Sequence, residues 1–298
     1  MKSKLITFGI LLMGILLIGC SKELTTEEIQ NKLIQANSNL NSYSVDMKMS
    51  MNMVTEMLGQ QMNIKSDINS KGNIDRTNKK MVLKGTVKYD TSGMRTEMDT
   101  ETYALDNYLY TKTMNMWMKM KLDKDIWTQQ DQVSQIVELV QSGTIERLED
   151  ETIDKNPYYV IKINPDLKKV VELALQQQQQ SELLNQNMDF GDMIKSYSST
   201  IWVNKKTFVI EKSKTDMKML MTPENMGKKG TTTSGEIEMD SSVEIKISNI
   251  NKDFVINLPE EAKDAMDLTE LKESLNQKSE QAKGTTSITG NAIAEVFS

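Results

Sequence analysis

The chain of 298 residues contains no histidine and only one cysteine, and these absences exclude most catalytic and metal sites. Without histidine there can be no histidine-based triad, dyad or zinc site. A single cysteine cannot form a disulfide bond within the chain, so packing must stabilise the fold. The sequence also lacks a glycine-rich phosphate loop and a nucleophile elbow. We therefore expect a protein that is not an enzyme and that needs no cofactor or metal.

Basic clusters and long apolar runs are also scarce. The formal net charge is −6, and no group of lysines and arginines stands out, so we expect no nucleic-acid partner. Beyond the N-terminus no apolar run approaches the roughly 18 residues of a transmembrane helix. The apolar content of 38% is low, which fits a sheet with one solvated face.

The N-terminus has the pattern of a secretion signal. Lys2 and Lys4 precede an apolar run over residues 5–18, which is short for a membrane span and right for a signal sequence. The run ends in "LIGC" (17–20), which resembles the lipobox of prokaryotic lipoproteins. The resemblance implies that Cys20 is lipid-modified and anchors the protein to the extracytoplasmic side of the cell membrane, where two acyl chains suffice for stable attachment. The alternative is an ordinary secretory signal in which Cys20 is incidental.

The most unusual pattern is a methionine at every second position, in a chain that contains 23 of them. Side chains alternate between the two faces of a strand, so this spacing places the methionines of each stretch on one face. A shorter stretch, "DMKMLM" (216–221), follows the same period. The pattern predicts half-buried strands with a soft apolar face, because methionine is unbranched and adapts to irregular partners. The two longer stretches contribute Met47, Met49, Met51 and Met53, and Met114, Met116, Met118 and Met120.

Capping and periodicity predict the order of elements along the chain. Thr25 or Thr26 caps an amphipathic helix that ends near Asn41. Alternation and turn residues then predict a long antiparallel meander. Its expected strands are 43–57, 61–70, 80–90, 93–105, 108–113 and 115–122, with turns at 71–73, 77–80, 90–93 and 106–107.

Helical spacing returns in the middle of the chain, and strands close it. The expected helices are 124–142 and a second one opened by Pro165, which runs into the low-complexity glutamines 176–180. The expected later strands are 144–151, 157–163, 198–204, 207–221, 236–251 and 254–259, with a loop at 222–235 and a short capping helix after Pro259. We divide the chain into a signal peptide (1–19), a lipid-anchored tether (20–26), one domain (27–278) and a disordered tail (279–298).

This order of elements, with three motifs, resembles the LolA/LprG-like group of lipoprotein-sorting and lipid-carrier proteins. The hairpin "IWVNKKTFVI" (201–210) looks like a recurrent hairpin of that group. "NYLYTKTMNMWMKM" (107–120) looks like its pair of strands with Tyr-x-Lys and Trp-x-Lys, and "NINKDFVINLPEEA" (249–262) looks like its closing strand. The resemblance implies an α+β fold: a strongly curved antiparallel sheet, or half-barrel, with helices packed in its concave face.

The resemblance also implies an apolar cavity between sheet and helices that accepts acyl chains. We therefore expect a membrane-anchored lipoprotein that binds or carries lipids or other hydrophobic ligands, with the eight methionines at the cavity. Two alternatives stay open. The methionines could fill a core without a physiological ligand, and the protein could be a ligand-free interaction, regulatory or sensor module at the cell surface.

A more remote alternative takes the methionines as thioether ligands for Cu(I), which prefers soft donors. Methionines two apart on a strand lie about 6.5–7 Å from each other along the chain. Adjacent pairs on one strand are therefore too far apart to share one ion without help from a second strand. Histidine, which commonly accompanies such segments, is absent.

Overall fold

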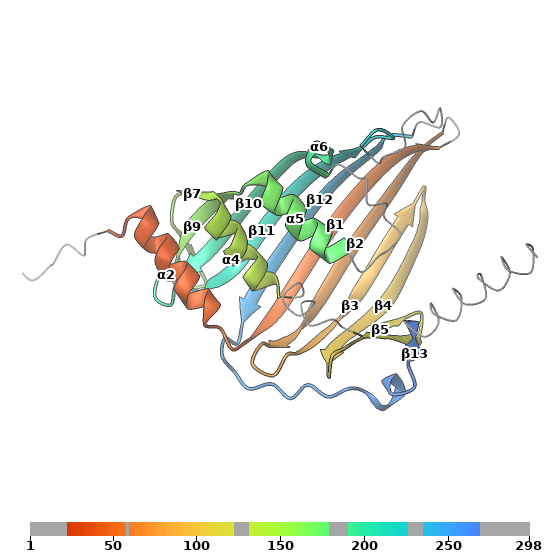
Figure 1. Cartoon of the computed structure of the whole chain (residues 1–298), viewed down its shortest axis with the longest axis horizontal. Helices are drawn as coiled ribbons and strands as arrows, with labels where there is room; N and C mark the ends of the chain where they lie inside the picture. Colours follow the sequence, from red (N-terminus) through yellow and green to blue (C-terminus); the bar gives the residue numbers. More distant parts are fainter. Residues whose placement is uncertain (1–22, 58–59, 122–130, 179–189, 226–234, 269–298) are drawn as a thin grey trace, which may run out of the picture.

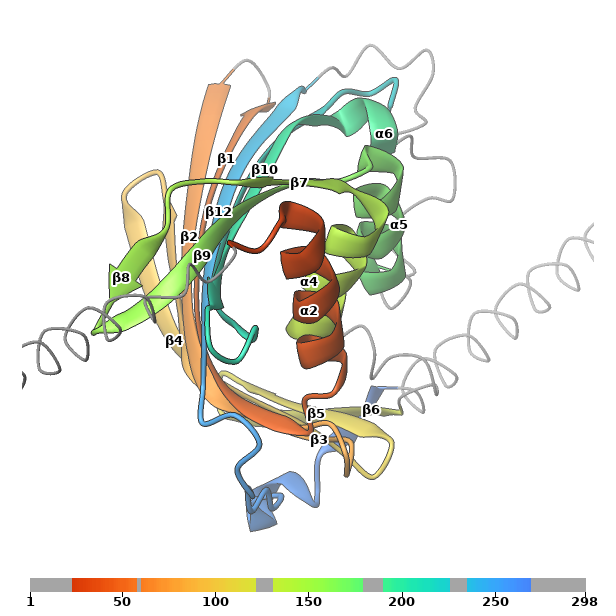
Figure 2. The same cartoon turned by 90° about the vertical axis from the view of Figure 1, so that its left-hand side faces the viewer.

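The computed structural model describes residues 23–57, 60–121, 131–178, 190–225 and 235–268. Within these ranges, thirteen strands form one curved sheet, and the helices lie on its concave side (Figures 1 and 2). All strand pairs are antiparallel except a short parallel pair at one edge. The expected half-barrel architecture is confirmed. The signal peptide, Cys20, residues 124–130 of the helix expected at 124–142, and the tail at 279–298 lie outside the described residues.

The first half of the chain forms the predicted meander. Each strand pairs with the one before it, and both turn residues at 106–107 and at 114–115 have positive φ. Turns of this kind match the right-handed twist of the flanking strands. The strands are β1 (Ser42–Met57), β2 (Gln60–Asp75), β3 (Lys80–Thr91), β4 (Met94–Leu105), β5 (Tyr108–Thr113) and β6 (Met116–Lys121).

The second half returns to the opposite side of β1. Its last long strand pairs with β1 in antiparallel fashion, so β1 lies in the middle of the sheet. The order across the sheet is β13-β6-β5-β4-β3-β2-β1-β12-β11-β10-β9-β7, with β8 also paired to β9. The strands are β7 (Thr144–Arg147), β8 (Glu151–Ile153), β9 (Asn156–Asn164), β10 (Ile194–Asn204), β11 (Ile210–Met221) and β12 (Ile237–Ser248).

The helices α2 (Thr26–Ser38), α4 (Gln132–Ser142), α5 (Leu167–Gln178) and α6 (Phe190–Met193) pack on the inner face of the sheet. Thr25 caps α2 as predicted: its hydroxyl accepts from the Glu28 backbone N–H, while the Glu28 carboxylate accepts from the Thr25 backbone N–H. Ile29 and Leu33, one turn apart, are fully buried. The helical spacing of Ile29, Leu33, Ala36 and Leu40 predicts an apolar stripe, and Ile29 and Leu33 of this stripe pack against the sheet.

Two aliphatic clusters join these helices to the sheet. One packs Ile29, Leu33 and Val140 against Ile161 and Ile201, and the other packs Val133 and Val137 of α4 against residues of β1, β2, β3 and β12. Branched aliphatic side chains dominate both clusters. Burying each such side chain contributes about 1.5–3 kcal/mol.

Residues 71–73 do not form the predicted turn. β2 continues through them, and Gly72 pairs with Val45 and with Leu83. A Cβ at Gly72 would lie 1.7 Å from the Val82 carbonyl oxygen. The glycine therefore allows close approach of two strands rather than a change of direction.

The C-terminal part of the domain also differs from the prediction. Residues 254–259 form no strand; the segment instead crosses the outer face of the sheet, where Ile256 packs in a cluster with Trp117 and Tyr103. The predicted capping helix is reduced, within the described residues, to one 3₁₀ turn, η2 (Glu260–Ala262). A short strand then follows, β13 (Met266–Asp267), which pairs in parallel with β6.

A buried polar junction connects α2, α4 and the sheet. Asp131 is 3% exposed and caps α4, and its carboxylate lies 2.6 Å from Nε of Arg76 at the end of β2. The Arg76 guanidinium also donates to the carbonyls of Asn37 and Leu40 at the end of α2. The hydroxyl of Tyr43, on β1, donates to Asp131. Burial and then the charge of Asp131 raise the pKa of Tyr43 well above its ordinary value, so this phenol stays a donor.

We expect Asp131→Asn to lower the free energy of unfolding by about 2–3 kcal/mol. Asparagine still caps a helix, but the half-buried Arg76 charge loses its counter-charge. The matched control is Asp46→Asn on the outer face, where the partner Lys71 is 76% exposed, and its cost is below about 1 kcal/mol. Chemical denaturation of both variants measures the difference. Equal losses would show that the junction does not hold the helices to the sheet.

Candidate functional site

The candidate site is the inner face of the sheet, which we define as the face on which the helices lie. Tyr43 and Val45 of β1 pack beside Val133 and Val137 of α4, so the odd-numbered residues of β1 point inward. The even-numbered residues of β1 therefore point to the outer face. The strand register then extends this assignment to every neighbouring strand.

The four methionines predicted on β1 all lie on the inner face. Met47, Met49, Met51 and Met53 alternate with Lys48, Ser50 and Asn52, which point outward. All four methionines are half-buried, neither fully enclosed nor fully exposed. Met47 packs at the border of an aliphatic cluster, and the other three continue away from it along the strand.

The second methionine stretch is only partly as predicted. The register places Met116, Met118 and Met120 of β6 on the inner face, opposite Thr113, Thr111 and Leu109. Met114 does not share that face: it lies in the turn before β6, with φ of 51°, and is 67% exposed. The alternation in the sequence begins two residues before the strand does, because Met114 and Asn115 form the turn that precedes β6. Met116 is also largely exposed, at 59%.

The structure brings together methionines from strands that are distant in sequence. Met53 on β1 pairs with Met239 on β12, which pairs in turn with Met219 on β11. One step along the strands, Ser241 of β12 lies between Met51 and Met217. We define the methionine patch as Met51, Met53, Met217, Met219 and Met239. The alternation in residues 216–221 predicts that Met217 and Met219 share one face of a strand. Nothing in the sequence around Met239 indicates which residues of other strands lie beside it.

The methionine patch is distinct from the packed interior. Among the described methionines, only Met81 and Met193 are fully buried. All five patch residues are half-buried, and only Met219 among them packs directly against an aliphatic cluster. The patch is therefore an apolar surface that continues the core beyond the region where α2 and α4 pack.

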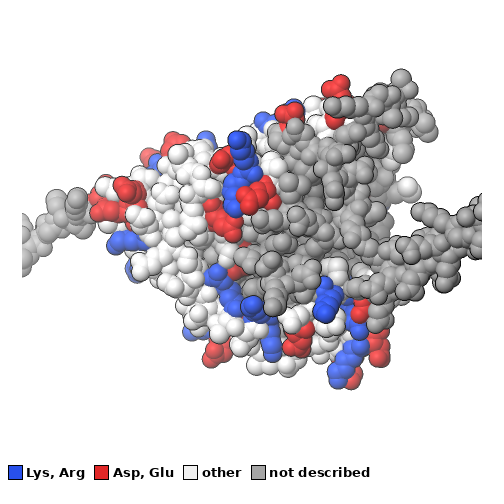
Figure 3. All heavy atoms as spheres, in the orientation of Figure 1, with Lys and Arg blue, Asp and Glu red and all other residues white. Residues whose placement is uncertain are grey.

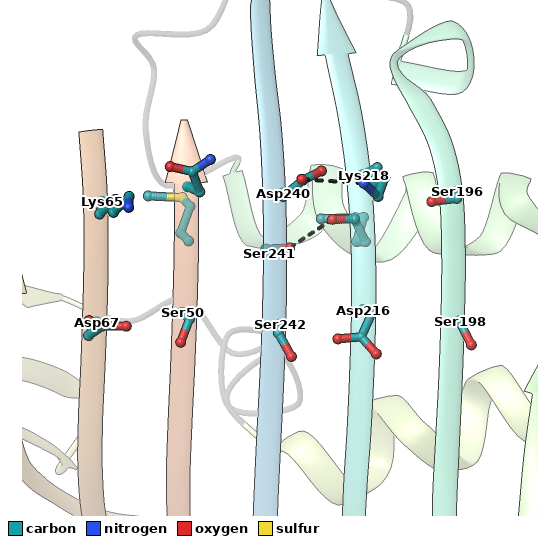
Figure 4. A pocket seen from close by; sticks show the side chains of 13 residues that line it. Ser50, Lys65, Asp67, Ser196, Ser198, Asp216, Lys218, Asp240, Ser241 and Ser242 are labelled. Atoms are coloured by element: carbon teal, nitrogen blue, oxygen red, sulfur yellow. Dashed lines mark hydrogen bonds and ion pairs between the residues drawn. The ribbon is translucent and has the colours of Figure 1, made fainter. Parts of the chain in front are cut away.

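The outer face behind the patch has the opposite character. An open groove of about 500 Å³ crosses β2, β1, β12, β11 and β10 there, and Figure 4 shows its side chains in two rows. The Lys218 ammonium lies 3.3 Å from the Asp240 carboxylate within it. The side chains that point outward along this groove are serines, Asn52 and charged residues, whereas Met51, Met217 and Ser241, which also border it, belong to the inward-pointing positions of their strands. The labelled lining residues are Ser50, Lys65, Asp67, Ser196, Ser198, Asp216, Lys218, Asp240, Ser241 and Ser242.

Charges on the described surface are mixed in sign. Figure 3 shows lysines and arginines interspersed with acids on the side seen in Figure 1, as where Lys169 lies 3.2 Å from both Glu138 and Glu172. Among the described residues, no group of three or more acidic, histidine or cysteine side chains could hold a metal ion. None of the helices in the described ranges is long and apolar enough to cross a membrane.

Comparison with known sequences identifies a family but no characterised relative. The sequence profile of a family of unknown function, DUF6612, matches residues 25–267. No curated protein sequence matches the chain.

Solved structures similar to the chain include lipoproteins and a lipoprotein-sorting domain, as in the group that the sequence resembles. The lipoprotein LppX of Mycobacterium tuberculosis is 12% identical, with a TM-score of 0.45 over 78% of this chain and 100% of its own. LprF of Mycobacterium bovis is 13% identical, with a TM-score of 0.40 over 78% and 98%. A putative outer membrane lipoprotein-sorting protein domain from Vibrio parahaemolyticus is 12% identical, with a TM-score of 0.23 over 78% and 93%. Likeness at this level carries no argument about function.

Two consecutive residues of β1 test the assignment of the faces. Met49→Asn places an amide on the half-buried inner face and is expected to lower the free energy of unfolding by about 1–3 kcal/mol. Ser50→Asn makes the same amide on the exposed outer face, with an expected change within about 0.5 kcal/mol. Denaturant titration of the two variants measures both. If Ser50→Asn were the more damaging change, the two faces would have been assigned in reverse.

Proposed function

Because the chain belongs to DUF6612, a family of unknown function, its role must be inferred from its own residues, and we propose that it is a lipid-anchored extracytoplasmic lipoprotein that binds hydrophobic ligands on its inner face. The ligands would be lipids or other molecules with acyl chains. The anchor would be the diacylglyceryl group on Cys20. No catalytic role is proposed.

The observation that carries the ligand proposal is the half-buried methionine patch on the concave side of the sheet. The aliphatic residues of the two clusters are enclosed by the helices, whereas the patch methionines keep part of their surface accessible. Methionine side chains adapt to irregular apolar partners. Each methylene group that moves from water onto such a surface contributes about 0.8 kcal/mol.

The cross-strand neighbours of the patch support an apolar occupant. Ile64 lies beside Met53 on one side of the first row, and Ile194 lies beside Met219 on the other. In the second row, Ser66 and Tyr197 are the neighbours of Met51 and Met217. None of these four neighbours is a lysine, arginine or acid, so an acyl chain on either row would meet no charge from them.

The anchor proposal is tested by Cys20→Ser. In a bacterium that lipidates its own lipoproteins, the wild-type chain is expected to take up labelled palmitate and to sediment with membranes. The variant is expected to lose the label, because the serine hydroxyl does not replace the thiol in lipid transfer. If the variant took up as much labelled palmitate as the wild-type chain, the lipid would be attached at another residue, and the proposal of an anchor at Cys20 would be wrong.

The ligand proposal is tested with a fluorescent acyl probe, dansyl-undecanoic acid, on the Cys20→Ser chain. Met51→Gln with Met217→Gln replaces two thioethers by polar amides, and we expect the dissociation constant to rise at least about tenfold, a loss of about 1.4 kcal/mol. Met51→Leu with Met217→Leu keeps the apolar character and volume, so binding should stay within about twofold. Circular dichroism confirms that both variants fold.

Two serines on the outer face provide a matched control for this test. Ser50→Gln with Ser242→Gln adds the same amides behind the patch and should leave the probe affinity unchanged. If the unaltered chain binds no probe, and native mass spectrometry of protein from its own host shows no bound lipid, the proposal fails. A stable protein partner recovered from membranes under those conditions would favour the ligand-free interaction module.

A further inference from the structure

Three methionines lie side by side on adjacent strands in the first row of the methionine patch. Met53 on β1 is the register partner of Met239 on β12, and Met239 is the register partner of Met219 on β11. The assignment of faces places all three on the inner side. In the second row, Met51 of β1 and Met217 of β11 lie on either side of Ser241 of β12. The two rows across these three strands therefore contain five methionines and one serine.

The sheet supplies the spacing that one strand cannot. Methionines two apart on a strand are about 6.5–7 Å apart, whereas register partners on neighbouring antiparallel strands have Cβ atoms about 4.5–5.5 Å apart. Sulfur atoms that share one ion lie within about 4.6 Å of each other if the metal–sulfur bonds are similar to those of zinc, about 2.3 Å. Two rotatable bonds, Cα–Cβ and Cβ–Cγ, position the methionine sulfur, so the sulfurs of register partners can close this gap without backbone movement. Met53 and Met219 are two strand spacings apart, about 9.5 Å, so both side chains must lean toward Met239 to reach one ion.

The surroundings of the row define which ion it would accept. Its flanking residues are Ile64 and Ile194, which offer no competing ligand. The ion pair of Lys218 with Asp240 belongs to the outer face, on the opposite side of the same strands. A site of neutral thioethers without a carboxylate favours a soft monovalent ion, whereas Zn²⁺, Mg²⁺ and Ca²⁺ need imidazole, thiolate or oxygen ligands.

We propose that Met53, Met219 and Met239 form a three-thioether site for Cu(I), with Met51 and Met217 as additional donors in the adjacent row. The site uses the sulfur lone pairs, whereas acyl binding uses only the apolar character of the same face. Replacement of methionine by leucine therefore separates the two: it removes the sulfur and keeps a side chain of similar volume.

The test uses the full-length Cys20→Ser chain in detergent, so that the only sulfur atoms are thioethers. Titration with Cu(I) under anaerobic reducing conditions, against the chromophoric competitor bicinchoninate, measures affinity and stoichiometry. We expect one tightly bound Cu(I) per chain. The triple variant Met53→Leu, Met219→Leu, Met239→Leu should bind at least about 100-fold more weakly, because it loses the ligands themselves, and loss of supporting groups alone costs 10–100-fold.

The matched control removes three methionines from the same inner face at its edge. Met116→Leu, Met118→Leu and Met120→Leu all lie on β6, away from β1, β12 and β11, and should leave the Cu(I) affinity within about twofold. X-ray absorption of the loaded wild-type chain should show sulfur neighbours around copper. Equal loss in both triple variants, competitor retaining all the copper, or a coordination shell without sulfur would each overturn the site.

The dansyl probe distinguishes this site from the proposed function. The Met53, Met219, Met239 leucine variant should keep its acyl affinity while it loses Cu(I). A chain that binds Cu(I) but no acyl probe would overturn the ligand proposal and leave the metal site standing. A chain that binds the probe but not Cu(I) would do the reverse.

Discussion

The pairing of β1 with β12 is the constraint on which the rest of the molecule depends. It joins a meander built from residues 42–121 to strands that come from the second half of the chain, and it makes β1 the centre of one continuous sheet. Without it the strands would form two separate sheets, one from β13 to β1 and one from β12 to β7, instead of one sheet that curves around the helices. The junction of Arg76, Asp131 and Tyr43 then fixes α2 and α4 to the sheet at one end of β1.

The same pairing determines what the inner face can bind. Twelve consecutive register pairs between Ser44 and Thr55 of β1 and their partners on β12 set which side chains are neighbours. A shift of one residue would bring Met53 beside Glu238 or Asp240 and break the row of thioethers. The proposed acyl surface and the proposed copper site therefore depend on the same register.

Local patterns in the sequence predict the elements well, because each depends on residues that are close in the chain. The cap at Thr25 and Glu28, the buried stripe of α2 and the inward face of Met47–Met53 all follow from short-range spacing. Met114 was misplaced because alternation does not show where a strand gives way to a turn.

Features that depend on contacts between residues far apart in the chain could not be predicted from local sequence patterns. Phe254, Ile256 and Leu258 do alternate, but their side chains pack on the cluster around Trp117 while their backbone forms no ladder. Asp267 of β13 lies 3.7 Å from Lys119 of β6, a contact between residues far apart in the sequence. Met239 is the only methionine of β12, so only the fold reveals its place between Met53 and Met219.

The central position of β1 has a consequence for the order in which the chain folds. β1 is the first strand to be made, yet its partner β12 follows roughly 190 residues later, and contacts between such distant segments form slowly. Until β12 arrives, β1 is the open edge of a growing sheet, with unpaired backbone groups and a row of methionines on one side. If the meander forms before the rest of the chain is made, this edge stays exposed until β12 pairs with it, so chaperone protection matters most in the interval between β1 and β12.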